Sequence, residues 1–352
     1  MRFLDEHGLA ALVHGLAREY ELYGPVRVGD RLALGRVEAD ENPRVPEWNE
    51  FRLPESLKPL FLPTSRVLAS WGRDGPRAGP ASRPCAVIGA KACDLSALHI
   101  LDQVLMNHQY REPGWCKARE RNLVIAGDCT AHGPSCFCTM LGDVPHPTAH
   151  FDLNLSPVGG GYVVESGSVK GDELLGQHAV LFRDATPVEV AERDARRAAV
   201  AAGVRAQNER WRTKDPFDVS VEKNLKTRIW GRLAATCVEC NACNMVCPTC
   251  HCFMLLDLPT AEGAERISLW DSCFRAGYAR MAGGGTPRLQ LIERFKNHYY
   301  HKFVSFPRNW GVTACTGCGR CVDACMGRID KRACLHRLET EWIPSEVLEE
   351  VE

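Results

Sequence analysis

The stretch CVECNACNMVCPTCHC, from Cys237 to Cys252, holds six cysteines in sixteen residues. Its first four cysteines have the spacing C-x2-C-x2-C-x3-C, and the same spacing recurs from Cys315 to Cys325. Three thiolates at successive x2 spacing can bind one face of an iron-sulfur cube, while the fourth thiolate, three residues further on, points to the other cube of a two-cluster protein. The sequence therefore predicts two [4Fe-4S] clusters and one-electron chemistry.

The predicted ligand sets are crossed between the two motifs. One cluster takes Cys237, Cys240, Cys243 and Cys325, and the other takes Cys315, Cys318, Cys321 and Cys247. A proline usually follows the fourth cysteine; Pro248 provides it in the first motif, and Met326 replaces it in the second. Structural zinc is the alternative, because zinc sites also use C-x2-C pairs. A third cysteine at the same spacing has no use in a tetrahedral zinc site and favours iron-sulfur clusters.

The remaining cysteines fall into two groups and three single residues. Four thiols in the first half could bind a third [4Fe-4S] cluster or could pack as small hydrophobic groups; these are Cys93, Cys129, Cys136 and Cys138. Three thiols that follow the first motif could hold a further metal or pack beside a cluster; these are Cys250, Cys252 and Cys273. Cys85, Cys116 and Cys334 are expected to be ordinary core or surface thiols.

Charged and imidazole side chains near the motifs leave two interpretations open. His132 and His251 adjoin cysteine groups, and we expect them to pack or to hydrogen-bond to cluster sulfur rather than to bind iron. Lys331, Arg320 and Arg328 lie near the second motif. Their charges would either raise a cluster's potential or be solvated at the surface.

The hydrophobic pattern predicts an α+β protein of two domains. Leu9, Leu12, Val13 and Leu16 predict an amphipathic helix near the start, and GPVRVGDRLALGRV predicts one or two short strands. CAVIGA and NLVIAG predict buried strands, GGGYVVESGS a hairpin, and residues 187–211 a helix. We expect a mixed α/β domain over residues 1–215.

A second domain is expected over residues 216–352. Sixty-seven residues separate Cys247 from Cys315, and helical patterns at 221–237 and 288–303 precede the two motifs. These features predict an α-helical ferredoxin-like domain that holds its clusters between helices.

Composition limits the classes of partner. Forty-three basic and 44 acidic residues nearly cancel, so a nucleic-acid-binding or membrane-surface role has no electrostatic support. The first twenty residues lack the apolar run of a signal peptide, and no stretch is long and apolar enough to span a bilayer. We expect a cytoplasmic protein, in which eighteen cysteines would remain reduced or bind metal.

Several motifs together resemble a known family. CVECNACNMVCPTCHC, WDSCF, MAGGG, HKF and CTGCGRC, with GAKACDLSAL and CFCTMLG, are similar to the iron-sulfur subunit shared by soluble sulfhydrogenases, where it is the beta subunit, and by anaerobic sulfite reductases. The resemblance covers roughly residues 85–330. It implies an electron-transfer subunit that links a flavoprotein partner, which binds FAD and NAD(P)H, to a catalytic partner of hydrogenase, sulfite reductase or heterodisulfide-reductase-like type.

Other functions remain open at this point. The chain has no G-x-G-x-x-G fingerprint, Walker loop, H-E-x-x-H pair or G-x-S-x-G elbow, so nucleotide binding and substrate chemistry are expected in other subunits. One alternative is a catalytic iron-sulfur subunit that reduces a sulfur compound directly. Another is a zinc-stabilised scaffold that joins other subunits.

Overall fold

The computed structural model describes residues 1–37, 48–72, 75–77 and 83–341. The chain forms two compact units. The first comprises Met1–Leu62, Ala81–Gln207 and Thr316–Cys318, and the second comprises Pro63–Pro80, Asn208–Cys315 and Gly319–Glu352. The chain therefore enters the second unit after Leu62 and again after Gln207, and a three-residue piece of the second cysteine motif belongs to the first unit.

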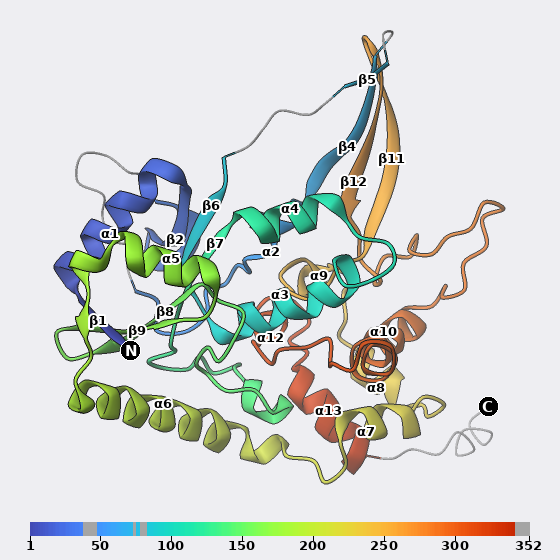
Figure 1. The fold of residues 1–352 in the computed structure, drawn as a ribbon. Helices are drawn as coiled ribbons and strands as arrows, with labels where there is room; N and C mark the ends of the chain where they lie inside the picture. The colour runs from blue at the N-terminus through green and yellow to red at the C-terminus, as the bar shows by residue number, and fades with distance from the viewer. Residues whose placement is uncertain (38–47, 73–74, 78–82, 342–352) are drawn as a thin grey trace. The chain divides into compact units, whose positions relative to one another are not determined.

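The first unit is built on one mixed sheet (Figure 1). Within the described residues its strand order is β10-β1-β9-β8-β7-β6-β2-β3. The four central strands β8, β7, β6 and β2 are parallel to one another, and the outer strands pair antiparallel. The strands are β1 (Arg2–Asp5), β2 (Glu21–Val28), β3 (Arg31–Arg36), β6 (Cys85–Ala90), β7 (Leu123–Gly127), β8 (Leu153–Val158), β9 (Gly161–Ser166) and β10 (Arg183–Asp184).

Helices cover both faces of this sheet. Ala86, Ile88 and Ile125 point to the face that packs against α1 (Glu6–Glu19) and α5 (Val169–Gln177). Val87 and Val124 point to the opposite face, where α2 (Lys58–Phe61), α3 (Ala92–Leu105) and α4 (Pro113–Arg121) pack. Successive strand residues alternate between faces, so a strand buried on both sides must be apolar throughout. This confirms CAVIGA and NLVIAG as buried strands.

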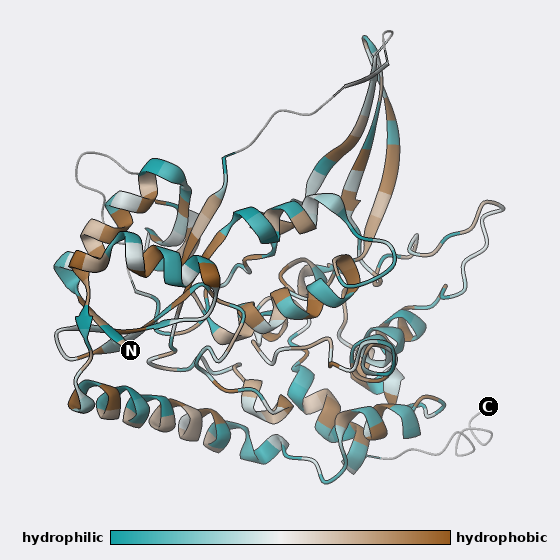
Figure 2. Ribbon diagram, viewed as in Figure 1, coloured by the Kyte–Doolittle hydropathy of each residue, from teal (hydrophilic) through white to brown (hydrophobic). Residues whose placement is uncertain are grey.

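Helix α6 (Pro187–Asn208) is the longest helix of the first unit. Figure 2 shows hydrophobic and hydrophilic residues alternating along it. Val200, Ala201 and Val204 on one side are buried, as the amphipathic pattern requires. The predicted helix over 187–211 is confirmed, except that its last residues tighten into a 3-10 turn, Glu209–Trp211.

The second unit is mainly helical around the cysteine motifs. The predicted helix before Cys237 is divided into α7 (Phe217–Lys223) and α8 (Ile229–Ala234). The predicted helix before Cys315 is α10 (Leu291–Tyr300), which continues through a π-helical turn, His301–Ser305, into α11 (Phe306–Trp310). Short helices α9 (Ala242–Met245) and α12 (Arg320–Asp323) lie inside the motifs, and α13 (Lys331–Thr340) follows them.

The second unit also contains a sheet that the sequence did not predict. Strands β11 (Phe253–Thr260) and β12 (Gly263–Trp270) form a hairpin, and β12 pairs with β4 (Ser65–Gly72), which pairs with β5 (Gly75–Arg77). The hairpin lies between the two motifs in sequence. In the part of the chain that the structure describes, no helix combines the length and the apolar character needed to cross a bilayer.

Candidate functional site

The two cysteine motifs share one backbone conformation. Glu239 and Asn241, on either side of Cys240, have positive φ angles of 52° and 64°. Gly317 and Gly319, on either side of Cys318, have φ angles of 63° and 76°. A short helix, α9 or α12, then carries the third cysteine of each motif. The sequence repeat is therefore also a structural repeat.

The end of the second motif lies against the start of the first. Thr236 Oγ1 donates a hydrogen bond of 2.7 Å to the carbonyl oxygen of Gly327. A Cβ on Gly327 would lie 2.1 Å from the carbonyl oxygen of Thr236, so the backbones approach closely there. Cys325 interacts electrostatically with both Cys237 and Cys243. These contacts bring together Cys325 and two cysteines of the first motif.

The end of the first motif lies against the start of the second in the same way. Thr249 Oγ1, two residues after Cys247, donates a hydrogen bond of 2.8 Å to the carbonyl oxygen of Ala314. Ala314 immediately precedes Cys315. The two junctions are equivalent, since each joins the residue before a motif's first cysteine to a residue two positions after the other motif's fourth cysteine.

Lys302 is a buried cation at the second junction. Its Nζ donates to Cys247 Sγ at 3.4 Å, to Thr249 Oγ1 at 2.9 Å and to the Ala314 carbonyl oxygen at 2.9 Å. Burial alone would lower the pKa of Lys302, but the thiolates of Cys247, Cys250 and Cys315 raise it well above its usual value. All three donors of the ammonium group are used, and its charge faces sulfur.

Further cations lie inside the second unit. Lys331 and Arg320 are both buried, so the solvated interpretation is wrong for these two residues, whereas Arg328 is exposed as that interpretation requires. Burial raises the pKa of Cys243 to about 11, and the Lys331 ammonium opposes this shift. Buried positive charge near cysteines is suited to an anionic iron-sulfur cluster, whose potential it would raise.

The second cysteine group lies beyond the carboxyl ends of two central strands of the first unit's sheet. Cys93 is in the first turn of α3, after β6, and Cys129 follows the end of the neighbouring parallel strand β7. Cys136 and Cys138 come from the loop after Cys129. Cys129 interacts electrostatically with Cys136, and Cys138 with both. The parallel strands thus deliver these thiols to the same region.

Lys91 is the cation of this group. It is fully buried, and its Nζ donates a hydrogen bond of 2.8 Å to the carbonyl oxygen of Asp128 and lies 5.1 Å from the centre of the Trp48 ring. Burial lowers the pKa of Lys91, and the charges of Cys129, Asp128 and Cys93 oppose that shift. Burial also raises the pKa of Cys129 to about 12. The Lys91 side chain therefore lies near two of the four thiols, Cys93 and Cys129.

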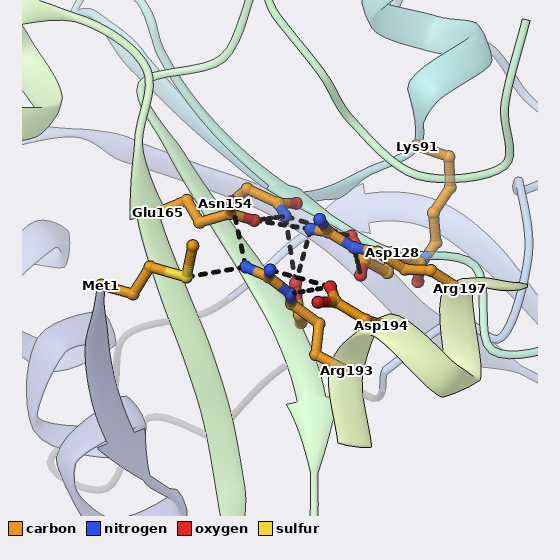
Figure 3. A network of polar contacts seen from close by, with 9 residues as sticks. Met1, Lys91, Asp128, Asn154, Glu165, Arg193, Asp194 and Arg197 are labelled. Carbon is orange, nitrogen blue, oxygen red and sulfur yellow. Dashed lines mark hydrogen bonds and ion pairs between the residues drawn. The ribbon is translucent and has the colours of Figure 1, made fainter. Parts of the chain in front are cut away.

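A buried ion network holds the chain just before Cys129 (Figure 3). Arg197 of α6 binds the Asp128 carboxylate at 2.6 Å and Glu165 at 2.6 Å. Asn154 Nδ2 donates to the same Asp128 carboxylate at 3.0 Å. Arg193, one helical turn before Arg197, binds Glu165 at 3.1 Å. Helix α6 is thereby tied to strands β8 and β9 and to the end of β7.

Further hydrogen bonds hold the loop with Cys136 and Cys138 and join it to the segment Thr316–Cys318. Gln207 Nε2 of α6 donates to the Cys136 carbonyl oxygen at 2.6 Å. Arg52 Nη2 donates to Ser135 Oγ at 2.9 Å, and Arg52 Nε donates to the Cys318 carbonyl oxygen at 2.6 Å. The Phe137 amide donates to the Gly317 carbonyl oxygen at 2.7 Å. The segment Thr316–Cys318 therefore packs on this loop, within the first unit.

The predicted histidines pack against neighbours. The His251 ring lies 5.8 Å from that of His301 and 6.0 Å from that of Phe306, and its Nδ1 is 3.0 Å from the Thr249 carbonyl oxygen. His132 packs against Gly203 of α6. Among the described residues, no group of three or more His, Cys, Asp or Glu side chains is arranged to hold a single metal ion.

Lys302, Lys91 and Arg197 are site residues that sequence reasoning missed. Lys302 lies in HKF, one of the stretches that carry the family resemblance, and this was its only signal. The cysteines of the two motifs and the four cysteines of the first unit each have the sulfur ligands that an iron-sulfur cofactor would use. Each set also has a buried lysine nearby, Lys302 or Lys91, whose positive charge would offset the negative charge of thiolate-bound iron.

Comparison with known proteins gives two findings. The profile of the 4Fe-4S dicluster domain family matches residues 236–329, which include both cysteine motifs. The chain is also 30% identical over 246 residues to sulfhydrogenase 2 subunit beta of Pyrococcus furiosus. That similarity covers 69% of this chain and 71% of the relative.

Proposed function

Since the chain belongs to the sulfhydrogenase beta subunit family, we propose that it is the electron-transfer subunit of a multi-subunit oxidoreductase. The 4Fe-4S dicluster domain implies two [4Fe-4S] clusters, and membership of a hydrogenase subunit family implies a complex of several subunits. Bound clusters would supply one-electron transfer, while the protein sets their position and potential.

The observation that carries the proposal is the pair of equivalent junctions between the motifs. Because Cys325 interacts with Cys237 and Cys243, the crossed set of Cys237, Cys240, Cys243 and Cys325 is favoured for one cluster. Lys302 interacts with both Cys247 and Cys315, which favours the set of Cys315, Cys318, Cys321 and Cys247 for the other. Lys302 and Lys331 would hold positive charge beside these thiolates.

The four cysteines around Lys91 are proposed to bind a third [4Fe-4S] cluster. The support is that Cys129, Cys136 and Cys138 interact with one another, and that the buried Lys91 side chain interacts with Cys129 and Cys93. The contact of Phe137 with Gly317 adds a second argument, since it joins this group directly to the chain of the second motif. A third cluster there would extend the electron pathway.

The proposed partners follow from what the chain lacks. A flavoprotein subunit that binds FAD and NAD(P)H would exchange electrons with one end of the relay, and a catalytic subunit would do so with the other. Neither nucleic acid nor a membrane is expected as a partner, because the charges of the chain nearly cancel and the described helices include no span. A cytoplasmic location is part of the proposal.

Metal analysis of protein purified without oxygen tests the proposal. Iron, zinc and acid-labile sulfide are measured per chain, together with the low-temperature paramagnetic resonance spectrum of the reduced protein. About eight irons would support the two motif clusters alone, and about twelve would support the third cluster as well, at four irons per cube. Zinc without labile sulfide would contradict the electron-transfer function.

A further inference from the structure

Three cysteines between the two motifs are used by neither proposed ligand set. Cys250 and Cys252 precede β11, and Cys273 follows β12. The hairpin pairs Phe253 with Trp270, and the amide of Asp271 donates a hydrogen bond of 2.8 Å to the Cys252 carbonyl oxygen. Strand pairing therefore brings Cys252 and Cys273 close together, and the two thiols interact with each other.

Asn244 fixes the position of Cys273. Its Nδ2 donates to Cys273 Sγ at 3.2 Å and to Ser272 Oγ at 2.9 Å, and its Oδ1 accepts from Cys250 Sγ at 3.7 Å. Asn244, Ser272 and Cys273 are all buried, whereas Cys252 is half-buried. One thiol of the pair is thus more accessible than the other.

His298 provides a further donor to Cys273. Burial, with the charges of Lys331 and Lys302, lowers the pKa of His298 well below its usual value, so the ring is neutral. Lys331 Nζ lies 2.9 Å from His298 Nε2, and an ammonium group can only donate, so Nε2 is the acceptor. The proton of the neutral ring is then on Nδ1, which lies 3.7 Å from Cys273 Sγ. The interaction with Cys252 and burial nevertheless raise the pKa of Cys273, so Cys273 is the protonated member of the pair.

We propose that Cys252 and Cys273 form a redox-active dithiol that reacts with small disulfides, with Cys252 attacking the disulfide and Cys273 resolving the product. The hydrogen bond from Cys273 lowers the pKa of Cys252 against the opposing effect of burial, and Tyr278, whose Oη is 3.9 Å from Cys252 Sγ, lowers it further. The more accessible thiol is therefore also the better nucleophile. The proposal is independent of the electron-transfer function.

The reaction is an ordinary thiol-disulfide exchange. The Cys252 thiolate attacks a disulfide RS–SR, which forms a mixed disulfide and releases RS⁻. Cys273 transfers its proton to the departing thiolate and attacks Cys252 Sγ, which releases the second RS⁻. That thiolate takes up the proton that Cys252 lost when it ionised. In sum, one disulfide RS–SR and two protein thiols give the Cys252–Cys273 disulfide and two molecules of RSH.

Contact between the two thiols distinguishes this pair from cluster ligands. Cysteines that bind one cube are bonded to different irons, and the cube keeps their sulfur atoms apart. Cys252 and Cys273 instead lie at the paired ends of one hairpin, where the backbone brings two side chains near each other as the partners of a disulfide must be.

Peptide mapping of the full chain with its clusters tests the proposal. Protein purified without oxygen is treated with glutathione disulfide, denatured, alkylated and digested with trypsin. Peptide 267–275 contains Cys273 as its single cysteine, and Cys252 is in peptide 233–266. We expect these two peptides to become linked and to separate again after reduction with dithiothreitol.

Serine variants identify the two roles. Cys252→Ser should abolish the link and leave Cys273 reduced, whereas Cys273→Ser should leave glutathione attached to Cys252. Cys116→Ser, in α4, is the control and should link as the unchanged protein does. The proposal is overturned if peptide 267–275 is recovered fully alkylated after treatment, if the link persists in Cys252→Ser, or if either variant of the pair loses iron.

Discussion

Gly317 is the residue through which the second cysteine motif packs on the loop of Cys136 and Cys138, and its replacement by alanine tests that packing. Its φ of 63° costs an alanine roughly 1–2 kcal/mol. A Cβ there would lie 2.5 Å from the Cys138 nitrogen and 2.6 Å from the Phe137 carbonyl carbon. These are backbone atoms, so the loop itself must move, and the hydrogen bond from the Phe137 amide is lost at a net cost of about 0.5–1.5 kcal/mol.

The expected total destabilisation of Gly317→Ala is therefore about 1.5–3.5 kcal/mol. Gly29→Ala is the matched control, because Gly29 has a φ of 59° but a Cβ would meet nothing within 4 Å. Gly29→Ala should be destabilised only by the cost of placing an alanine at a positive φ angle. Thermal unfolding of both variants without oxygen, with iron content measured alongside, separates the two effects. Equal melting temperatures and equal iron contents would refute the packing argument.

Three other substitutions test the charges and ligands of the sites. Lys302→Met removes a positive charge 3.4 Å from Cys247 Sγ, and this loss disfavours the reduced state of the neighbouring cluster. One midpoint potential in an EPR-monitored titration should therefore fall by on the order of 100 mV. Unchanged potentials would contradict this prediction. Cys325→Ser should lower the iron content per chain, because the first-motif cluster loses a ligand. Cys334→Ser replaces a buried thiol outside both motifs and should leave the iron content unchanged; equal iron contents in the two variants would count against the crossed sets. Arg197→Met leaves the buried Asp128 carboxylate without its arginine partner and should lower stability by about 3–5 kcal/mol. Arg196→Met removes an exposed pair worth at most about 1 kcal/mol, so the two melting temperatures should differ clearly.

The sequence predicted those elements whose signals are local. Alternation and apolar runs identified β6 and β7, because a strand buried on both faces must be apolar at every position. The cysteine spacing identified the dicluster domain, because ligand spacing is dictated by the geometry of the cofactor. The amphipathic patterns of α1 and α6 were equally plain.

Elements made by distant pairing were not predictable. Strand β4 pairs with β12 although Ser70 and Glu265, which face each other, are nearly two hundred residues apart in sequence. Nothing local marks such a pairing, since each strand's partner is set by the rest of the fold. The same holds for Lys91 and Lys302, whose sequence neighbours do not show that their ammonium groups are buried beside cysteines.

The segment between the two motifs does more than join them. It supplies Lys302, the cation that bonds to Cys247, and it supplies the hairpin that brings Cys252 to Cys273. A compact two-cluster ferredoxin needs neither, because its clusters require only the eight motif cysteines. The insertion is therefore suited to two separate tasks: a buried positive charge beside one proposed ligand, and a thiol pair that exchanges electrons two at a time next to cofactors that exchange them singly.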